Sequence, residues 1–119
     1  MRVENMTSPR TGRPVANQFI IDDCDKTVFQ SYNSTIVEID WKHGIIVVFE
    51  DWDYSATTGK YRNKFMEDMG FDDMATKQGF AKCMNDGKYE EFEIYKDWEI
   101  YDNLESAIAF KNYVNSKGV

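Results

Sequence analysis

The chain has 119 residues, a formal net charge of −7, 42% hydrophobic residues and 15% aromatic residues. This size and apolar content suffice for one folded domain over residues 1–119, and they exclude a mostly disordered chain. The longest apolar run, residues 45–49, is too short to span a membrane, and no apolar signal segment opens the chain. We therefore expect a cytoplasmic protein with no membrane association, in which the isolated Cys24 and Cys83 are reduced, structural residues of the kind that are usually buried.

The first half of the chain predicts β-strands joined by tight turns. Aromatic and β-branched residues are dense in four segments, which are 15–21, 27–33, 35–41 and 45–52. Turn-forming residues at 22–25 separate the first two segments. Within the third, Val37, Ile39 and Trp41 are expected on one face, and Ile36, Glu38 and Asp40 on the other. The four segments together predict an antiparallel meander.

The period of the apolar residues changes after Ser55. Tyr61, Phe65 and Met69 are spaced at i, i+4 and i+8, which predicts a helix that ends at Gly70. Residues 72–87 predict a second helix, capped by Asp72, although Gly79 is a poor helix residue. Residues 89–95 and 98–101 are alternating segments that predict an extra hairpin near 89–101.

The last segment, 102–118, predicts a third helix. Asp102 and Glu105 have capping-box spacing, and the apolar stripe consists of Leu104, Ala107, Ile108 and Val114. The fold class is therefore α+β, with an antiparallel β-meander in the N-terminal half packed with about three helices.

The segments that begin like a metal-binding motif lack the residues that such a motif requires at its other positions. Residues 51–62 begin like a calcium loop, but Ala56 and Arg62 stand where glycine and glutamate are needed. His43 is the only histidine, and no cysteine lies near it in sequence to complete a zinc site. We expect a protein that is not an enzyme and that carries no metal or cofactor.

The negative charge is concentrated near the C-terminus. Residues 86–105 carry eight acidic and two basic side chains, which gives −6 of the net −7. Such a surface attracts basic partners, although solubility alone also explains it. The expected acidic partner-binding surface consists of Glu90, Glu91, Glu93, Asp97, Glu99 and Asp102.

A stiff loop near the N-terminus carries two arginines. Pro9 and Pro14 restrict the backbone on either side of Arg10 and Arg13, whose planar guanidinium groups can bind phosphate or carboxylate. We favour an internal role, in which the arginines fold back onto the acidic surface and the amides of residues 17–18 tie the loop to the sheet.

The alternative is a basic patch that binds nucleic acid. Its residues are Arg10, Arg13, Lys60, Arg62 and Lys64, with Tyr32, Trp52, Tyr54 and Tyr61 as candidates for stacking on bases. Tyr61 also fits the helix stripe, where it would pack inward. The net charge makes direct nucleic-acid binding the less favoured hypothesis.

Three segments, "SPRTGRPVANQF" (8–19), "FQSYNS" (29–34) and "WDYSATTGKY" (52–61), carry a family resemblance. With them the chain resembles, over residues 6–70, small proteins encoded by bacteriophages and integrated mobile elements of Gram-positive bacteria. No chemistry is assigned to that group, so the resemblance transfers no catalytic residues. Residues 1–70 are then the family-like part with the first helix, and 71–119 are an acidic extension.

The resemblance implies a phage accessory protein in the cytoplasm of a bacterial host. We expect a non-enzymatic inhibitor of a host nucleic-acid-targeting defence system, anti-CRISPR or anti-restriction. Its acidic surface would act as a DNA mimic in a basic cleft of a host protein. The alternatives are a small nucleic-acid-binding protein that uses the basic patch, and a structural subunit of the phage machinery.

Overall fold

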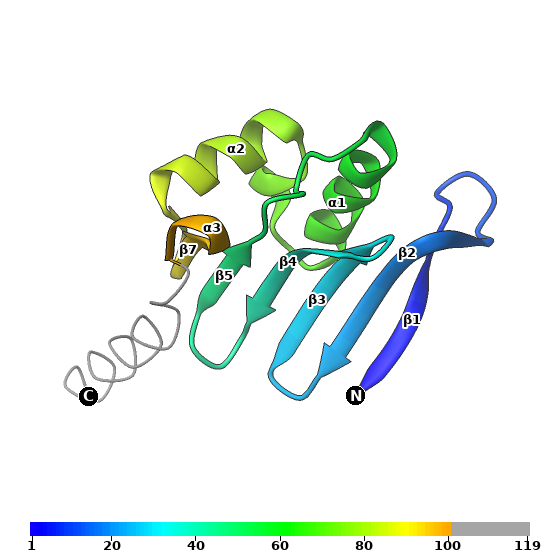
Figure 1. The fold of residues 1–119 in the computed structure, drawn as a ribbon, viewed down its shortest axis with the longest axis horizontal. Coiled ribbons are helices and arrows are strands. Elements are labelled where there is room, and N and C mark those ends of the chain that lie inside the picture. Colours follow the sequence, from blue (N-terminus) through cyan, green and yellow to red (C-terminus); the bar gives the residue numbers. More distant parts are fainter. Residues whose placement is uncertain (101–119) are drawn as a thin grey trace.

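The protein is built on a single β-sheet with helices packed against one of its faces (Figure 1). A computed structural model describes residues 1–100, so the expected helix over 102–118 and Asp102 lie outside the described residues. The strands are β1 (Arg2–Thr7), β2 (Pro14–Asp23), β3 (Lys26–Ser31), β4 (Ser34–Asp40), β5 (Ile45–Val48), β6 (Lys88–Tyr89) and β7 (Phe92–Lys96). The helices are α1 (Ala56–Asp68), the 3-10 helix η1 (Asp72–Met74), α2 (Lys77–Asp86) and α3 (Asp97–Ile100). The predicted α+β class is confirmed.

The sheet has the strand order β1-β2-β3-β4-β5-β7-β6. Strands β2 to β5 form the predicted antiparallel meander, and β1 pairs with β2 as a fifth strand that the sequence did not predict. After the crossover through α1, η1 and α2, β7 returns parallel to β5, with Ile46 opposite Ile94. Among residues 1–100, no helix has both the length and the apolar character needed to cross a bilayer.

The hairpin near the end of the described chain differs from the prediction in its turn. The chain reverses at Glu90, where φ is 52°, so residues 89–95 are not one strand. Residues 98–101 were expected to be a strand, but Asp97–Ile100 form a short helix. Both differences from the prediction arise from tertiary contacts, because the pairing of β7 with β5 determines where β7 begins and ends.

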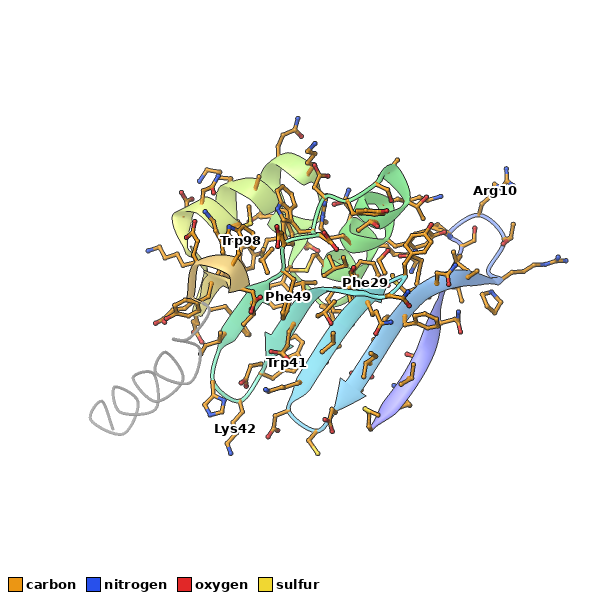
Figure 2. All side chains as sticks on the ribbon, viewed as in Figure 1. Arg10, Phe29, Trp41, Lys42, Phe49 and Trp98 are labelled. Carbon is orange, nitrogen blue, oxygen red and sulfur yellow. The ribbon has the colours of Figure 1, made fainter. Side chains whose placement is uncertain are left out.

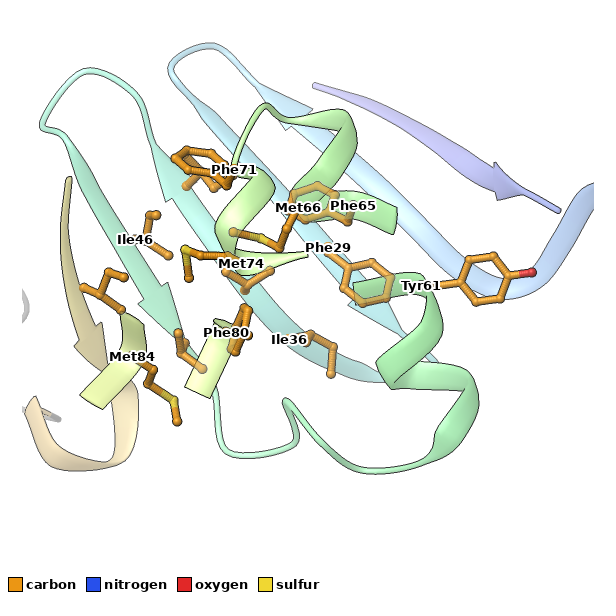
Figure 3. Close-up of a cluster of buried hydrophobic side chains, with 14 of the residues drawn as sticks. Phe29, Ile36, Ile46, Tyr61, Phe65, Met66, Phe71, Met74, Phe80 and Met84 are labelled. Atoms are coloured by element: carbon orange, nitrogen blue, oxygen red, sulfur yellow. The ribbon is translucent and has the colours of Figure 1, made fainter. Parts of the chain in front are cut away.

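The core lies between the sheet and its helices (Figure 3). Phe65 of the predicted helix stripe is fully buried, and its ring stacks on Phe29 of β3 with a centroid separation of 5.6 Å. Tyr61 packs inward in the same cluster, which confirms its structural role. This packing fixes α1 against the middle of the sheet.

A β-bulge changes the predicted face of Ile36. Phe29 pairs with Val37 and Gln30 pairs with Thr35, so Ile36 has no partner of its own across the strands. Ile36 and Val37 are consequently both fully buried in the same core, although they are adjacent in sequence. Placing them on opposite faces was wrong, because strict alternation assumes an unbroken ladder.

Residues 72–87 form two helices rather than the single predicted helix. The α2 N-cap is Thr76, not Asp72, and its side-chain oxygen accepts a hydrogen bond from Gly79 N at 3.0 Å. Gly79 lies against η1, where an added Cβ would collide with the carbonyl oxygen of Asp73. Gly79, which has a low helix propensity, is therefore the residue that lets η1 pack closely on α2.

We expect Gly79→Ala to lower the free energy of unfolding by about 1–3 kcal/mol, because the new methyl group overpacks the η1–α2 contact. Gly59→Ala in α1 is the matched control, since its Cβ would meet only the Arg62 guanidinium at 3.8 and 3.9 Å. The control should be neutral or stabilising by up to about 1 kcal/mol. Urea denaturation of both variants measures this, and equal stabilities would contradict the packing argument.

Candidate functional site

The segments that carry the family resemblance line two neighbouring hollows in the surface. The first, here called the groove, has a volume of about 1120 Å³ and lies between residues 7–9 and α1. The second, here called the pocket, has a volume of about 610 Å³ and lies between the β3–β4 turn and the start of α1. Ser55 lines both, so the two hollows adjoin at the N-cap of α1.

Arg62 lies in the wall of the groove and is only 1% exposed. Its Nη1 donates to the Trp52 carbonyl at 2.7 Å and lies 3.6 Å from Asp53 Oδ1, and its Nη2 donates to Asn63 Oδ1 at 3.0 Å. The guanidinium carbon lies 5.3 Å and 5.0 Å from the ring centroids of Trp52 and Phe80. Desolvation lowers the pKa of Arg62, against the opposing effect of Asp53. Arg62 is thus engaged inside the protein, whereas the predicted basic patch placed it on the surface.

Asp53 connects this buried charge to α2. Its Oδ2 accepts a hydrogen bond from Lys77 Nζ at 2.9 Å. That hydrogen bond lowers the pKa of Asp53, and the charges of Lys77 and Arg62 lower it further. Two residues later, the Ser55 side chain accepts from Thr58 N at 3.1 Å and so caps α1. The last three residues of the β5–α1 loop are therefore fixed to both α2 and α1.

The loop between β1 and β2 is held by its own hydrogen bonds. Ser8 N donates to the Arg13 carbonyl at 2.9 Å, and the Ser8 carbonyl accepts from Gly12 N at 2.8 Å. The Ser8 hydroxyl also accepts from Arg10 N at 3.3 Å. The side chains of Arg10 and Arg13 are exposed and form no ion pair within residues 1–100 (Figure 2 shows Arg10 projecting away from the sheet). The expected fold-back onto the acidic surface is therefore wrong.

The amides of residues 17–18 do not tie this loop to the sheet. Asn17 adopts a φ of 65°, and its backbone carbonyl accepts from Tyr32 N at 2.6 Å. Gln18 is fully buried, and neither atom of its side-chain amide has a hydrogen-bond partner. The tie is made instead by Asn5, whose Nδ2 donates to the Val15 carbonyl at 2.9 Å.

Basic side chains outnumber acidic ones around the groove. The cations of the lining are Lys60, Arg62, Lys64 and Lys77, and its carboxylates are Asp53, Glu67 and Asp68. Four cations against three carboxylates give the lining a charge of +1 in a chain of −7. The structure thus brings Lys60, Arg62 and Lys64 together with Lys77, which no sequence spacing connects to residues 60–64. Arg10 and Arg13 follow the lining residues 7–9 along the β1–β2 loop but do not line the groove.

Two of the lysines are already paired with carboxylates. Lys64 Nζ lies 2.9 Å from Asp68 Oδ2, and Lys77 Nζ lies 2.9 Å from Asp53 Oδ2. Exposed pairs of this kind contribute at most about 1 kcal/mol, so a bound anion can replace the carboxylate at small cost. Lys60 has no ion pair within the described residues and lies 5.5 Å from the Tyr61 ring centroid.

The acidic residues lie at both ends of β7 rather than in one compact group. Glu90 and Glu91 form the β6–β7 turn, whereas Asp97 and Glu99 belong to α3 beyond the other end of the strand. The five residues of β7 separate them by about 17 Å at strand rise. A single acidic wall therefore stays a prediction, and Asp102 lies outside the described residues.

Glu93, in β7, is engaged with a neighbouring tyrosine. Its Oε2 accepts a hydrogen bond from the Tyr95 hydroxyl at 2.6 Å. Desolvation, followed by this hydrogen bond, raises the pKa of Tyr95 to about 12. Glu99 is also partnered, since its Oε1 lies 3.5 Å from Lys96 Nζ. These contacts tie part of the predicted acidic surface to its own strand and helix.

Residue types that often carry catalysis lie apart from the groove. His43 Nδ1 lies 2.8 Å from Asp40 Oδ2, within the turn after β4. Cys83 is half-buried in α2, where desolvation raises its thiol pKa, but Cys24 is exposed in the β2–β3 turn with a φ of 53°. The expected burial is wrong for Cys24, because the turn places its side chain outside the sheet. Within residues 1–100, no three His, Cys, Asp or Glu side chains are grouped to hold a metal.

Comparison with known proteins shows that the residues lining the groove and the pocket lie in the part of the chain that matches a sequence family. The model of a family of unknown function (DUF8033) matches residues 1–82, which run from β1 into α2 and contain the linings of both hollows. No curated protein and no solved structure matches the chain.

We expect Arg62→Lys to lower the free energy of unfolding by about 2–3 kcal/mol, because an ammonium group cannot replace the forked contacts to Trp52, Asp53 and Asn63. Arg10→Lys is the control, with an expected change below about 0.5 kcal/mol at its exposed position. Chemical denaturation compares the two. If both variants were as stable as the wild type, Arg62 would not hold the loop.

The lowered pKa of Asp53 makes the free energy of unfolding depend on pH, with higher stability at neutral than at acidic pH. Its pKa is lower in the folded protein, so its carboxylate adds stability above the unfolded pKa, and this is lost as the pH falls through the folded pKa. We expect Asp53→Asn to be less stable than the wild type at neutral pH, with a difference that shrinks below about pH 4. Asp23→Asn, at an exposed carboxylate without an ion pair in residues 1–100, is the control. Thermal unfolding across pH measures the difference, and a constant offset for Asp53→Asn would contradict the assignment.

Proposed function

Since the chain belongs to the DUF8033 family of unknown function, we propose a function from its own groove. The protein is a non-enzymatic accessory protein that binds nucleic acid between the β1–β2 loop and α1. The observation that carries the proposal is that the groove lining has a charge of +1 in a chain of −7, with the exposed Arg10 and Arg13 on the loop that forms one side of it. A random distribution of charge in so acidic a protein would leave this surface negative.

The chemistry of the groove suits a phosphate backbone. Arg10 and Arg13 stand on a loop that its own hydrogen bonds hold in shape, so little conformational freedom is lost when they engage phosphate oxygens. On the facing side, Lys60 and Lys64 of α1 supply mobile ammonium groups. Contacts of both kinds release counterions from the nucleic acid, which makes the affinity depend on salt.

The inhibitor hypothesis has less support from the described residues. It requires the acidic side chains to act together, but they lie at both ends of β7, and Glu93 accepts a hydrogen bond from Tyr95. A phage accessory protein, as the resemblance implies, fits either activity. The groove therefore provides the better supported proposal, and inhibition of a host defence system stays a prediction.

We expect the double variant Lys60→Glu, Lys64→Glu to bind a labelled single strand of about 20 nucleotides at least about tenfold more weakly at 0.1 M salt, roughly 1.4 kcal/mol. Loss of two phosphate contacts should also reduce the slope of log K against log salt by about 1.4. Fluorescence anisotropy over a salt series measures both quantities.

The matched control is Lys42→Glu, an exposed lysine in the β4–β5 turn, away from the loop that carries Arg10 (Figure 2). The control changes the net charge without touching the groove, so it should retain the wild-type slope. The control changes the net charge by −2 and the double variant by −4, so a loss of binding free energy in the control half as large as in the double variant would mean that net charge alone governs binding. Absence of binding by the wild type would refute the proposal.

A further inference from the structure

Two tyrosines in the wall of the pocket have exposed rings. Tyr32 is 43% exposed in the β3–β4 turn, and Tyr54 is 70% exposed at the end of the β5–α1 loop. Within residues 1–100, neither ring stacks on another aromatic ring, whereas Trp52 and Tyr61 of the neighbouring sequence are packed inward. The packing of the protein therefore gives no reason for an aromatic side chain at these two positions.

Tyr32 also occupies an unfavourable backbone conformation. Its φ is 56°, in the left-handed region that favours glycine, and it is the first of the two residues between β3 and β4. Glycine is the preferred residue at a positive φ in such a short hairpin turn. Cys24 and Glu90 occupy the same position in their own two-residue turns, with φ of 53° and 52°, so this conformation belongs to the hairpin geometry. The feature particular to Tyr32 is its exposed ring beside the pocket, and this is what points to a role for the ring.

The lining of the pocket contains groups that hydrogen-bond to neutral polar ligands. The hydroxyls of Ser31 and Thr58, both in the lining, lie 2.9 Å apart. Gln18, whose buried amide has no partner, pairs with Ser31 across the sheet but lies outside the lining. The carboxylate of Asp51 accepts from Ser34 Oγ at 2.7 Å through one oxygen only. An aspartate repels phosphate but accepts hydrogen bonds from the N–H groups on the edge of a base.

We propose that the pocket takes an unpaired nucleobase, which stacks on Tyr32 and Tyr54 while the adjoining groove holds the phosphates. This inference rests on the proposed function and specifies its ligand as a single strand. The pocket volume of about 610 Å³ is in the range of small-molecule sites, and Ser55 joins it to the groove. Bases within a duplex are stacked and paired, so they cannot enter the pocket without being unpaired.

The test compares three ligands of equal length and phosphate count, which are a single strand, the matching duplex and a single strand whose nucleotides lack bases. The full chain is measured as wild type, as Tyr32→Gly, as Tyr54→Ala and as the double variant. Loss of stacking costs roughly 5- to 150-fold in affinity per base. We expect the wild type to bind the single strand about tenfold more tightly than the other two ligands, and the double variant to lose this preference while keeping its salt slope.

Two controls separate a base site from a structural effect. Tyr54→Phe keeps the ring and should keep the preference. Tyr32→Gly places glycine at a positive φ, so its thermal midpoint should equal or exceed that of the wild type although base binding falls. A lower midpoint would overturn the argument from the backbone at Tyr32.

The outcomes also distinguish this inference from the proposed function. Equal binding of the base-free strand, or a preference retained by Tyr54→Ala and the double variant, would overturn the base site and leave the groove intact. Displacement of the strand by a neutral oligosaccharide, but not by a nucleoside monophosphate, would overturn it in favour of a sugar site. Absence of binding to all three ligands would overturn both proposals.

Discussion

The buried guanidinium of Arg62 is the interaction on which the candidate site depends. It reaches from α1 to the Trp52 carbonyl and the Asp53 carboxylate, and the rings of Trp52 and Phe80 lie within 5.3 Å of its carbon atom. A buried charge is costly unless its partners are fixed, so these contacts hold the β5–α1 loop, α1 and α2 in one arrangement. Because Tyr54 and Ser55 follow Asp53 directly, the same arrangement positions the boundary between the groove and the pocket.

The segment from residue 52 to residue 63 thus combines two roles. Seven of its side chains take part in the packing, hydrogen bonds and ion pairs of the frame, and they are Trp52, Asp53, Ser55, Thr58, Tyr61, Arg62 and Asn63. Its outward side chains, Tyr54 and Lys60, take no part in that frame and face the two hollows. The part of the family resemblance that falls in this segment is therefore expected from stability alone. The outward residues, together with Arg10, Arg13 and Tyr32 from other segments, are the ones to which the proposed function assigns a ligand.

Features that depend on local periodicity were predictable from the sequence. The meander and the stripe of Tyr61 and Phe65 follow from side-chain alternation and helical spacing, which survive in almost any tertiary context. The parallel return of β7 beside β5 and the close approach at Gly79 were not predictable, because each depends on contacts between distant segments. The candidate site likewise has a part that was predictable from the sequence and a part that was not. The residue types were visible in sequence, but the burial of Arg62 and the addition of Lys77 from α2 arise only from the tertiary fold.

The charge distribution is compatible with the proposed binding of a polyanion by so acidic a protein. At physiological salt the screening length is about 8 Å, so a phosphate in the groove interacts mainly with the side chains around it. There the four cations outweigh the three carboxylates. Elsewhere acidic residues predominate, with Glu90 and Glu91 exposed at the β6–β7 turn. Under the proposed function, the net charge of −7 would disfavour nonspecific binding of a nucleic acid to the rest of the surface and so favour its approach to the groove.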